Sequence, residues 1–394
     1  MVTFSTRTPR SLAPNRLAAA VAEKRRPYAD LTVTNPTAVG LPLDDELLLL
    51  LADPRGAHYA PDPRGLPRAR EAVARWYDAR RVPARPENVI LTASSSEAYA
   101  FLFKLLCEPG DAVLVPAPSY PLLDALAELE CVALRRYPLD EADGWLVHAA
   151  AVEEALERAV SEGRRVRAVV LVTPNNPTGS GIRAAELDRL VALAARRGLA
   201  IVSDEVFLDY RYATARDEVA VAAGVPRDAL VFSLGGLSKS AGLPQLKAGW
   251  ILASGPEALL AEALDRLEWI ADAFLSVATP VQLALPDLLE RGRAAAGAIR
   301  ARVRANAGAL AGALPAGSPA AALPVRAGWS AVVRVPAVEP EEDLVLRLLQ
   351  THGVLVQPGY FFDFPHEAFL VLSLLPEPSV FADGLARLRE GLAR

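Results

Sequence analysis

Between residues 88 and 253 the chain repeats one pattern: a short apolar run, a polar loop, and then a segment with helical spacing. The apolar runs are nearly continuous, which is typical of strands buried on both faces of a parallel sheet. Helices between the strands would cover those faces. The pattern therefore predicts an α/β fold with a mostly parallel sheet sandwiched by helices, and its strands at 88–91, 111–115, 166–172, 199–202, 231–234 and 250–253.

The two ends of the chain follow other patterns. Residues 15–26 and 44–51 predict short helices, whereas 58–65 is too dense in Pro and Gly for regular structure. Residues 291–314, rich in alanine and arginine, predict one long helix. The remainder predicts a small α+β unit, with strands at 330–335, 354–356 and 369–374 and helices at 341–352 and 379–392.

Composition narrows the class of protein. The 394 residues suffice for two or three domains, and a hydrophobic content of 52% can fill sizeable cores. A net charge of −5 without a basic tail argues against nucleic acid as the main partner, and no apolar run approaches the ~20 residues that span a bilayer. Cys107 and Cys131 lie in segments that we expect to be buried, with reduced thiols. We therefore expect a soluble, cytoplasmic protein, and we predict no metal site.

Lysine is scarce, and one lysine stands at a notable position. The chain has 42 Lys and Arg residues, of which only Lys24, Lys104, Lys239 and Lys247 are lysines. An amine that must lose its proton and attack a carbonyl has to be lysine, because arginine stays charged. Lys239 follows an apolar strand and a Gly-Gly turn, at a strand end where parallel-sheet proteins place their chemistry. A solvated surface lysine is the plainer interpretation, and a phosphate-binding P-loop is excluded because its glycines are absent here.

Polar or aromatic groups follow four other predicted strands, so all would meet at one edge of the sheet. A run of serines opens a helix and would cradle an anion, a tyrosine offers a flat ring, and an asparagine lies in a Pro-rich turn. An aspartate ends a strand. Taken singly, these are an N-cap, a packing residue and turn residues. Together with the lysine they predict a site for pyridoxal phosphate, formed by Ser94, Ser95, Ser96, Tyr120, Asn176, Asp204 and Lys239.

Four short motifs identify a resemblance. Residues 173–179 (Thr-Pro-Asn-Asn-Pro-Thr-Gly), 203–205 (Ser-Asp-Glu), 238–239 (Ser-Lys) and 247–249 (Lys-Ala-Gly) resemble those of class I/II aminotransferases of fold type I. The resemblance extends from about residue 31 to the C-terminus. It implies a homodimer with active sites at the subunit boundary. It also implies a large cofactor domain at 43–285 and a small domain made of both chain ends, 1–42 and 286–394, which includes the long connecting helix.

The resemblance also implies roles for individual residues. Lys239 would form the internal aldimine and move a proton between Cα and the cofactor. Asp204 would pair with the pyridine nitrogen, and Asn176 would contact the 3-hydroxyl. Tyr120 would stack on the ring. The remaining cofactor contacts would come from Ser94, Ser95, Ser96, Ser238 and, across the subunit boundary, Tyr59.

Four positions depart from the family pattern. Phe207 stands where a tyrosine usually contacts the 3-hydroxyl, and we expect its lack of a donor to raise the pKa of the aldimine. Gly236 replaces a phosphate-binding serine. Lys247 replaces an arginine and keeps the charge without the bidentate geometry. Val371 falls where an arginine usually clamps the substrate carboxylate.

Val371 leaves the substrate open. The carboxylate could meet another cation, Arg211 or Arg326, or backbone amides near Thr34, Asn35 and Asn176. Tyr360 and Trp329 suggest an aromatic wall, although packing explains them equally well. We predict a substrate with a mainly apolar side chain.

The function predicted from these residues is transamination between an amino donor and a 2-oxo acid. Two alternatives stay open: a fold type I lyase or decarboxylase, which would share the site, and a non-catalytic regulator that binds the cofactor. The regulator ranks last because Lys239 is present and no DNA-binding domain precedes the fold.

Overall fold

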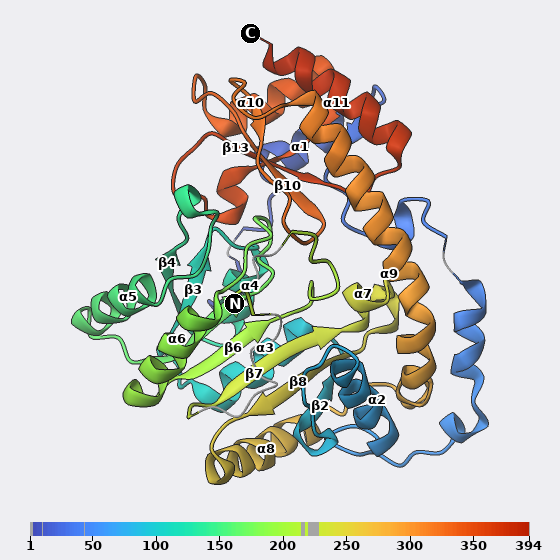
Figure 1. Ribbon diagram of the computed structural model, residues 1–394, viewed down its shortest axis with the longest axis vertical. Coiled ribbons are helices and arrows are strands. Elements are labelled where there is room, and N and C mark those ends of the chain that lie inside the picture. The colour runs from blue at the N-terminus through green and yellow to red at the C-terminus, as the bar shows by residue number, and fades with distance from the viewer. Residues whose placement is uncertain (1–2, 10, 43, 214–216, 220–227, 394) are drawn as a thin grey trace.

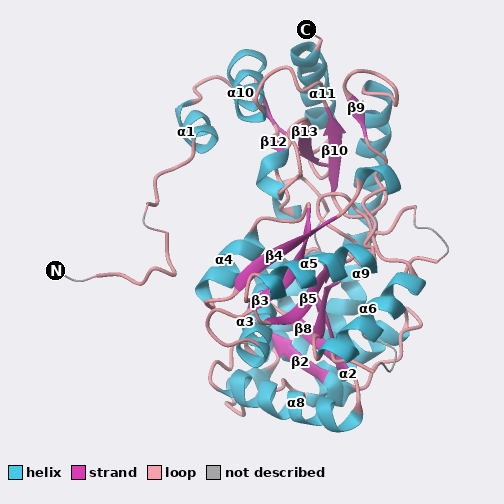
Figure 2. Ribbon diagram, turned by 90° about the vertical axis from the view of Figure 1, so that its left-hand side faces the viewer, coloured by secondary structure: helices cyan, strands magenta, loops and turns pink. Residues whose placement is uncertain are grey.

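A computed structural model describes residues 3–9, 11–42, 44–213, 217–219 and 228–393 (Figures 1 and 2). Its centre is a seven-stranded sheet in the order β2-β8-β7-β6-β5-β3-β4. Strand β8 runs antiparallel to both of its neighbours, and the other pairs are parallel. This confirms the predicted mostly parallel sheet, whose strands are β2 (Val89–Thr92), β3 (Ala112–Ala117), β4 (Ala133–Pro138), β5 (Val166–Val172), β6 (Ala200–Asp204), β7 (Val231–Gly236) and β8 (Gly249–Ser254).

Strand β4 is the one strand of this sheet that the sequence pattern did not predict. It lies at the sheet edge and pairs with β3 alone. Two of its residues, Arg135 and Arg136, break the apolar run and form ion pairs at the surface, Arg135 with Glu162 and Arg136 with Asp124. An edge strand tolerates such charges, whereas the rule used for prediction expects buried strands.

Two layers of helices cover the sheet, as predicted. Helices α3 (Ser95–Leu106), α4 (Leu122–Leu129) and α8 (Glu257–Asp272) pack on one face. Helices α2 (Pro67–Asp78), α5 (Ala149–Ser161) and α6 (Ala184–Arg197) pack on the other. Along β5, Ala168 and Val170 face the first layer and Val169 and Leu171 the second, because successive side chains of a strand point to opposite faces.

A smaller unit contains a four-stranded sheet in the order β12-β13-β10-β9. Its strands are β9 (Ala321–Ala322), β10 (Ser330–Arg334), β12 (Gln357–Pro358) and β13 (Phe369–Ser373), and its helices include α10 (Glu341–Arg347) and α11 (Pro378–Leu392). Strand β1 (Ala29–Asp30) pairs in parallel with β11 (Val354–Leu355). The N-terminal segment therefore packs with the C-terminal unit, and α1 (Arg16–Glu23) lies beside α10 (Figure 2). The residue limits given above for the two domains stay a prediction.

Helix α9 (Thr279–Ala313) connects the two units along one side of the molecule (Figure 1). It starts 12 residues before the predicted helix at 291, because the helix continues through Pro286, a residue that usually breaks one. In its first part, Leu285 packs into the core of the large unit. In its later part, Val303 packs into the core of the small unit. At Gly292 a side chain would collide with Ala241, directly after α7 (Leu237–Ser240). A glycine thus lets α9 support the turn that bears Lys239.

Smaller differences concern local conformation. Residues Asp45–Ala52 form a 3-10 helix, η2, near the predicted α-helix, and the predicted helix at 341–352 ends in a π-helical turn, η7 (Leu348–His352). Cys131 is exposed and Cys107 is half-buried, so the expectation of buried cysteines is wrong; both thiols are free. Within the described residues, none of the helices is long and apolar enough to cross a membrane. The other short turns are η1 (Pro36–Ala38), η3 (Pro54–Ala57), η4 (Pro86–Asn88), η5 (Glu141–Asp143), η6 (Pro244–Leu246) and η8 (Gly359–Phe362).

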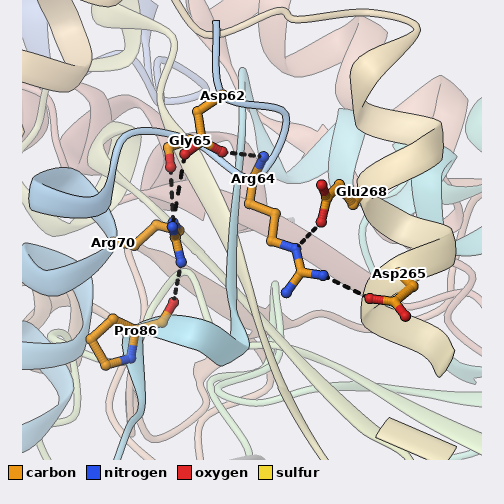
Figure 3. Close-up of polar contacts among 7 residues, drawn as sticks. All are labelled: Asp62, Arg64, Gly65, Arg70, Pro86, Asp265 and Glu268. Carbon is orange, nitrogen blue, oxygen red and sulfur yellow. Dashed lines mark hydrogen bonds and ion pairs between the residues drawn. The ribbon is translucent and has the colours of Figure 1, made fainter. Parts of the chain in front are cut away.

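Ion pairs fix the turn-rich segment before α2 (Figure 3). Arg64 pairs with Asp265 and Glu268 on α8, and its carbonyl accepts a hydrogen bond of 2.9 Å from the amide of Leu91 on β2. Gly65 has a left-handed φ of +95°, and a Cβ there would lie 2.5 Å from Cδ1 of the buried Leu91. Gly65 therefore permits the close approach of this segment to the sheet.

We predict that Gly65→Ala lowers the free energy of unfolding by about 2–5 kcal/mol, from the cost of a left-handed alanine and from overpacking against Leu91. Urea denaturation measures this change. Gly110→Ala is the matched control, because Gly110 has a similar φ of +91° with nothing within 4 Å of its added Cβ, and it should cost only about 1–2 kcal/mol. Equal losses in the two variants would contradict the close approach.

Candidate active site

The residues predicted to form a site come together at the carboxyl edge of the large sheet. Strand β6 ends at Asp204, and the loops after β3 and β5 bear Tyr120 and Asn176. Strand β7 leads into α7, which bears Lys239, and β2 leads into α3 with its serines. Parallel strands share this edge, which is where open α/β sheets form their sites.

Lys239 is enclosed by aromatic side chains. Its Nζ lies 4.6 Å from the ring centre of Trp329 and 5.6 Å from that of Phe207. Burial lowers the pKa of Lys239 to about 8, against the opposing effect of the negative charge of Asp204. A substantial fraction of this amine is therefore neutral near physiological pH, as a nucleophile or general base requires.

Asp204 is 3% exposed and accepts three hydrogen bonds. Its Oδ1 accepts from the amide of Val206 at 3.2 Å, and its Oδ2 accepts from the hydroxyls of Tyr99 at 3.3 Å and Tyr120 at 3.4 Å. Burial raises the pKa of Asp204 to about 6, although the hydrogen bonds and the charge of Lys239 oppose that rise. Asp204 is thus a buried acid whose pKa responds to the charge of the half-buried Lys239.

The start of α3 combines a cap with free amides. The hydroxyl of Ser94 accepts a 3.2 Å hydrogen bond from the amide of Glu97, so this serine is the N-cap. Ser95 and Ser96 occupy the first turn, where amides have no partner within the helix and the helix dipole favours an anion. A Cβ on Gly249 would lie 3.1 Å from the carbonyl carbon of Ser94. The start of β8 therefore lies directly against the start of α3.

Asn176 is held by a residue from the small unit that the sequence did not suggest. Its Oδ1 accepts a 3.1 Å hydrogen bond from Ser330 of β10. The neighbouring Asn175 is buried and fixes the turn through Thr178, whose hydroxyl lies 3.0 Å from its Oδ1. This turn is therefore rigid and faces the small sheet.

Tyr210, which the sequence analysis also missed, supports the backbone of Lys239. The hydroxyl of Tyr210 donates a 2.7 Å hydrogen bond to the backbone carbonyl of Lys239. Its ring packs edge-on against Trp329 at 5.0 Å, and Trp329 packs in the same way against Phe207 at 5.4 Å. Trp329 is 1% exposed, so its packing role is confirmed, while its part in an aromatic wall around a substrate stays a prediction.

Six other predicted contact residues lie at the surface, make local contacts or are half-buried. Lys247 is exposed with a left-handed φ of +50°, and Tyr59 is 82% exposed. Asn35 is exposed, and its side chain accepts a hydrogen bond from the amide of Thr37 at 3.0 Å. The ring of Tyr360 packs against Phe361 at 4.9 Å. Ser238 is half-buried beside Lys239, and Thr34 is exposed beside Asn35.

Val371 lies in the middle of the small sheet. It is 2% exposed and pairs with Val332 on one side and with Gln357 on the other. Directly paired residues of antiparallel strands share a face, so Gln357 is the polar neighbour of Val371. The strand thus has an apolar residue at the position where the resemblance led us to look for a cation.

The two alternative cations share one carboxylate. Arg211 Nη2 lies 3.5 Å from Glu218 Oε2, and Arg326 pairs with the other oxygen of Glu218. Arg211 also donates a 2.7 Å hydrogen bond to the carbonyl of Val219. The side chain of Glu218 is 1% exposed. Both guanidinium groups are therefore already engaged by a buried carboxylate.

Comparison with known proteins adds a family and a fold. The sequence matches the family described as aminotransferase class I and II over residues 31–377. It is 28% identical to alanine aminotransferase of Mycobacterium tuberculosis (strain H37Rv), over 91% of this chain and 84% of that protein. It is 30% identical to human tyrosine aminotransferase, over 66% of this chain and 57% of that protein.

Two solved structures show the same fold. An aminotransferase from Escherichia coli superposes with a TM-score of 0.84 at 23% identity, over 100% of this chain and 98% of that one. A double mutant of Thermus thermophilus aspartate aminotransferase superposes with a TM-score of 0.82 at 24% identity, over the whole of both chains.

We predict that Lys239 reacts with an amine-labelling reagent with a pH midpoint of about 8 in the cofactor-free protein, well below the ordinary lysine value of 10.5. Site-resolved mass spectrometry over pH 6–11 measures the midpoint, and the exposed Lys247 reports on the reagent. Asp204→Asn should move the midpoint lower, since the charge of Asp204 raises the pKa of Lys239. A midpoint near 10.5 in the unmodified protein would contradict the effect of burial on the pKa of Lys239.

Proposed function

Since the chain belongs to the class I and II aminotransferases, a family of pyridoxal-phosphate-dependent enzymes, we propose that its aminotransferase activity uses pyridoxal phosphate held at the edge described above. The enzyme would move an amino group from an amino donor to a 2-oxo acid. The observation that carries this proposal is that the buried Asp204 ends β6 and the half-buried Lys239 follows the adjacent strand β7 at the same sheet edge, with burial shifting their pKa values to about 6 and about 8.

The donor set fits this cofactor. Asp204 is a buried carboxylate that can pair with a protonated ring nitrogen, and the first turn of α3 offers amides and hydroxyls of Ser95 and Ser96 to a phosphate. Lys239 would hold the cofactor covalently. When bound, pyridoxal phosphate supplies an electron sink that stabilises negative charge at the substrate Cα.

The chain's own groups would divide the remaining work. Lys239 Nζ would take the proton from the substrate Cα, for which a lowered pKa is suited. Asp204 would keep its negative charge against the ring nitrogen. Asn176 would donate from Nδ2, because its Oδ1 accepts from Ser330, and Tyr120 would cover the ring. Trp329 and Phe207 would exclude water from Nζ.

Other contacts belong to the same proposal. Ser238 and Lys247 would add to the phosphate site, with Ser94 as the cap of the helix. Because Phe207 has no hydrogen-bond donor, Asn176 would be the residue that donates to the 3-hydroxyl. Further phosphate contact would come from Tyr59 of a second subunit, for which its 82% exposure is suited. We further propose a cytoplasmic homodimer, with domains at 43–285 and at 1–42 with 286–394.

The substrate proposal follows from Val371. A carboxylate entering a dry site needs a charged or hydrogen-bonding partner, and Arg211 and Arg326 are engaged by Glu218. Backbone amides near Thr34–Asn35 would serve, since residues 31 and 33 are hydrogen-bonded to Ser373, two positions after Val371. We propose a donor with an apolar or aromatic side chain, and the names of the alanine and tyrosine aminotransferases among the relatives support this class.

We predict that Lys239→Ala lowers turnover by about 10⁴-fold or more, since the variant has neither the nucleophile nor the base. Pyridoxal phosphate should still bind non-covalently through Asp204, Asn176 and α3, as a fluorescence titration would show. Lys104→Ala is the control, because Lys104 pairs with Glu130 at the far end of α3 and should leave turnover unchanged. Normal turnover in Lys239→Ala would reject Lys239, and Lys247 would then be the next candidate.

We predict that kcat/KM is at least about tenfold higher for alanine or an aromatic amino acid than for aspartate and glutamate. The side-chain carboxylate of an acidic donor would lack one charged contact, and a factor of ten corresponds to that loss. Steady-state assays with these donors and with a simple amine, each with a 2-oxo acid acceptor, measure the preference. Assays of released ammonia and carbon dioxide separate transamination from elimination and decarboxylation. A clear preference for aspartate would refute the proposed donor class.

A further inference from the structure

Tyr99 is a buried residue whose hydroxyl reaches the site from inside the protein core. It lies on the second turn of α3 and is 0% exposed, in the apolar layer that covers one face of the large sheet. Its hydroxyl lies 3.3 Å from Asp204 Oδ2. Its ring packs at 5.9 Å from Phe103, one turn further along the helix.

We propose that Tyr99 is a positioning residue for Asp204: its hydroxyl fixes the direction of the carboxylate and keeps the carboxylate ionised within a buried site. The link to catalysis rests on the proposed function, in which Asp204 pairs with the cofactor nitrogen. The contact between the two side chains does not depend on that function.

The geometry gives the two carboxylate oxygens separate donors. Oδ1 accepts from the amide of Val206, directly after β6. Oδ2 accepts from Tyr99 on α3 and from Tyr120 on the loop after β3. Lys239 on α7 is the charged group that faces this carboxylate from the remaining element. These contacts restrict rotation of the carboxylate about its Cβ–Cγ bond.

Tyr99 suits this role better than Tyr120 does. Tyr120 is half-buried on a loop, and in the proposed function its ring covers the cofactor. Tyr99 is held by a helix and by packing on all sides, so its hydroxyl stays in place whether or not the cofactor is bound. A fixed donor lowers the reorganisation needed when charge develops nearby.

The hydroxyl should act on the protonation of Asp204. Burial disfavours the charged carboxylate, while a hydroxyl that donates to it favours the charged form. Burial also raises the pKa of Tyr99 well above its ordinary value, so the phenol keeps its proton and can donate a hydrogen bond at every working pH. Without the Tyr99 hydroxyl, the Asp204 carboxylate would lose a hydrogen-bond donor. Its pKa would rise, so the carboxylate would become protonated at higher pH.

The sign of the pH effect follows from proton binding. Asp204 has a folded pKa of about 6 and an unfolded value of 3.8. Between these values the folded state binds more protons than the unfolded state, so stability is lost as the pH rises through this window. Removing the Tyr99 hydroxyl should raise the folded pKa by about one unit, and the window should extend upward by the same amount.

The first experiment measures this window in the full-length, cofactor-free protein. Urea midpoints between pH 4 and 8 are compared for the unmodified protein, Tyr99→Phe, Asp204→Asn and the double variant. Tyr137→Phe is the matched control, because Tyr137 is also 0% exposed and donates a 2.8 Å hydrogen bond to a backbone carbonyl, that of Val170. It should lower the midpoint equally at every pH.

We expect the pH window over which stability falls to reach about one pH unit higher in Tyr99→Phe than in the unmodified protein. This extension should vanish in the Asp204→Asn background. A pH profile of Tyr99→Phe that runs parallel to that of Tyr137→Phe would overturn the proposal. So would an extension that persists without the Asp204 carboxylate, because the hydroxyl would then act elsewhere.

The second experiment titrates the same proteins with pyridoxal phosphate at pH 5 and at pH 7.5. If the ionised carboxylate binds the cofactor, a rise of one pKa unit in Tyr99→Phe should raise the Kd about tenfold at pH 5, below the pKa of Asp204, and by less than about twofold at pH 7.5. Tyr137→Phe should leave the Kd unchanged at both pH values. An unchanged Kd at pH 5 in Tyr99→Phe would refute the link to the cofactor. If the unmodified protein bound no pyridoxal phosphate, the proposed function would fail, while the stability profiles would still judge the contact between Tyr99 and Asp204.

Discussion

The site depends on the removal of two opposite charges from water. Asp204 and Lys239 are both enclosed, and burial moves their pKa values toward each other, to about 6 and about 8. A buried carboxylate or ammonium costs free energy unless it finds a partner, so each group needs the other and the hydrogen bonds around it. This constraint explains why hydroxyls surround Asp204 and why aromatic rings surround Lys239.

The fold meets this constraint by fixing both groups on short, well-supported segments. Asp204 is the last residue of a strand in the middle of the sheet. Lys239 follows the adjacent strand, with its carbonyl bonded to Tyr210 and its turn packed close to Gly292 of α9. Because α9 also packs with the small unit, the helix couples the lysine turn to that unit.

The sequence predicted the sheet and the site edge, because buried strands give uninterrupted apolar runs and their ends carry recognisable polar motifs. It failed where tertiary contacts override local rules: at β4, whose arginines are tolerated at an edge, and at Pro286, which α9 absorbs. Tyr99, Tyr210 and Ser330 were missed for a related reason. Each acts on a residue 29 or more positions away, as Tyr210 does on Lys239, and neither composition nor spacing signals such a contact.

The apolar strand at Val371 follows the same logic of burial. Val371 shares its face with Val332 and belongs to the same apolar cluster as Phe369, so an isolated guanidinium there would have to be desolvated against hydrocarbon. Arg211 and Arg326, the two other arginines considered for the substrate carboxylate, form ion pairs with Glu218. The neighbouring polar group is the uncharged Gln357. In the proposed function, a site built in this way would hold a substrate more by excluding water from its side chain than by neutralising its carboxylate, and that would favour apolar donors over acidic ones.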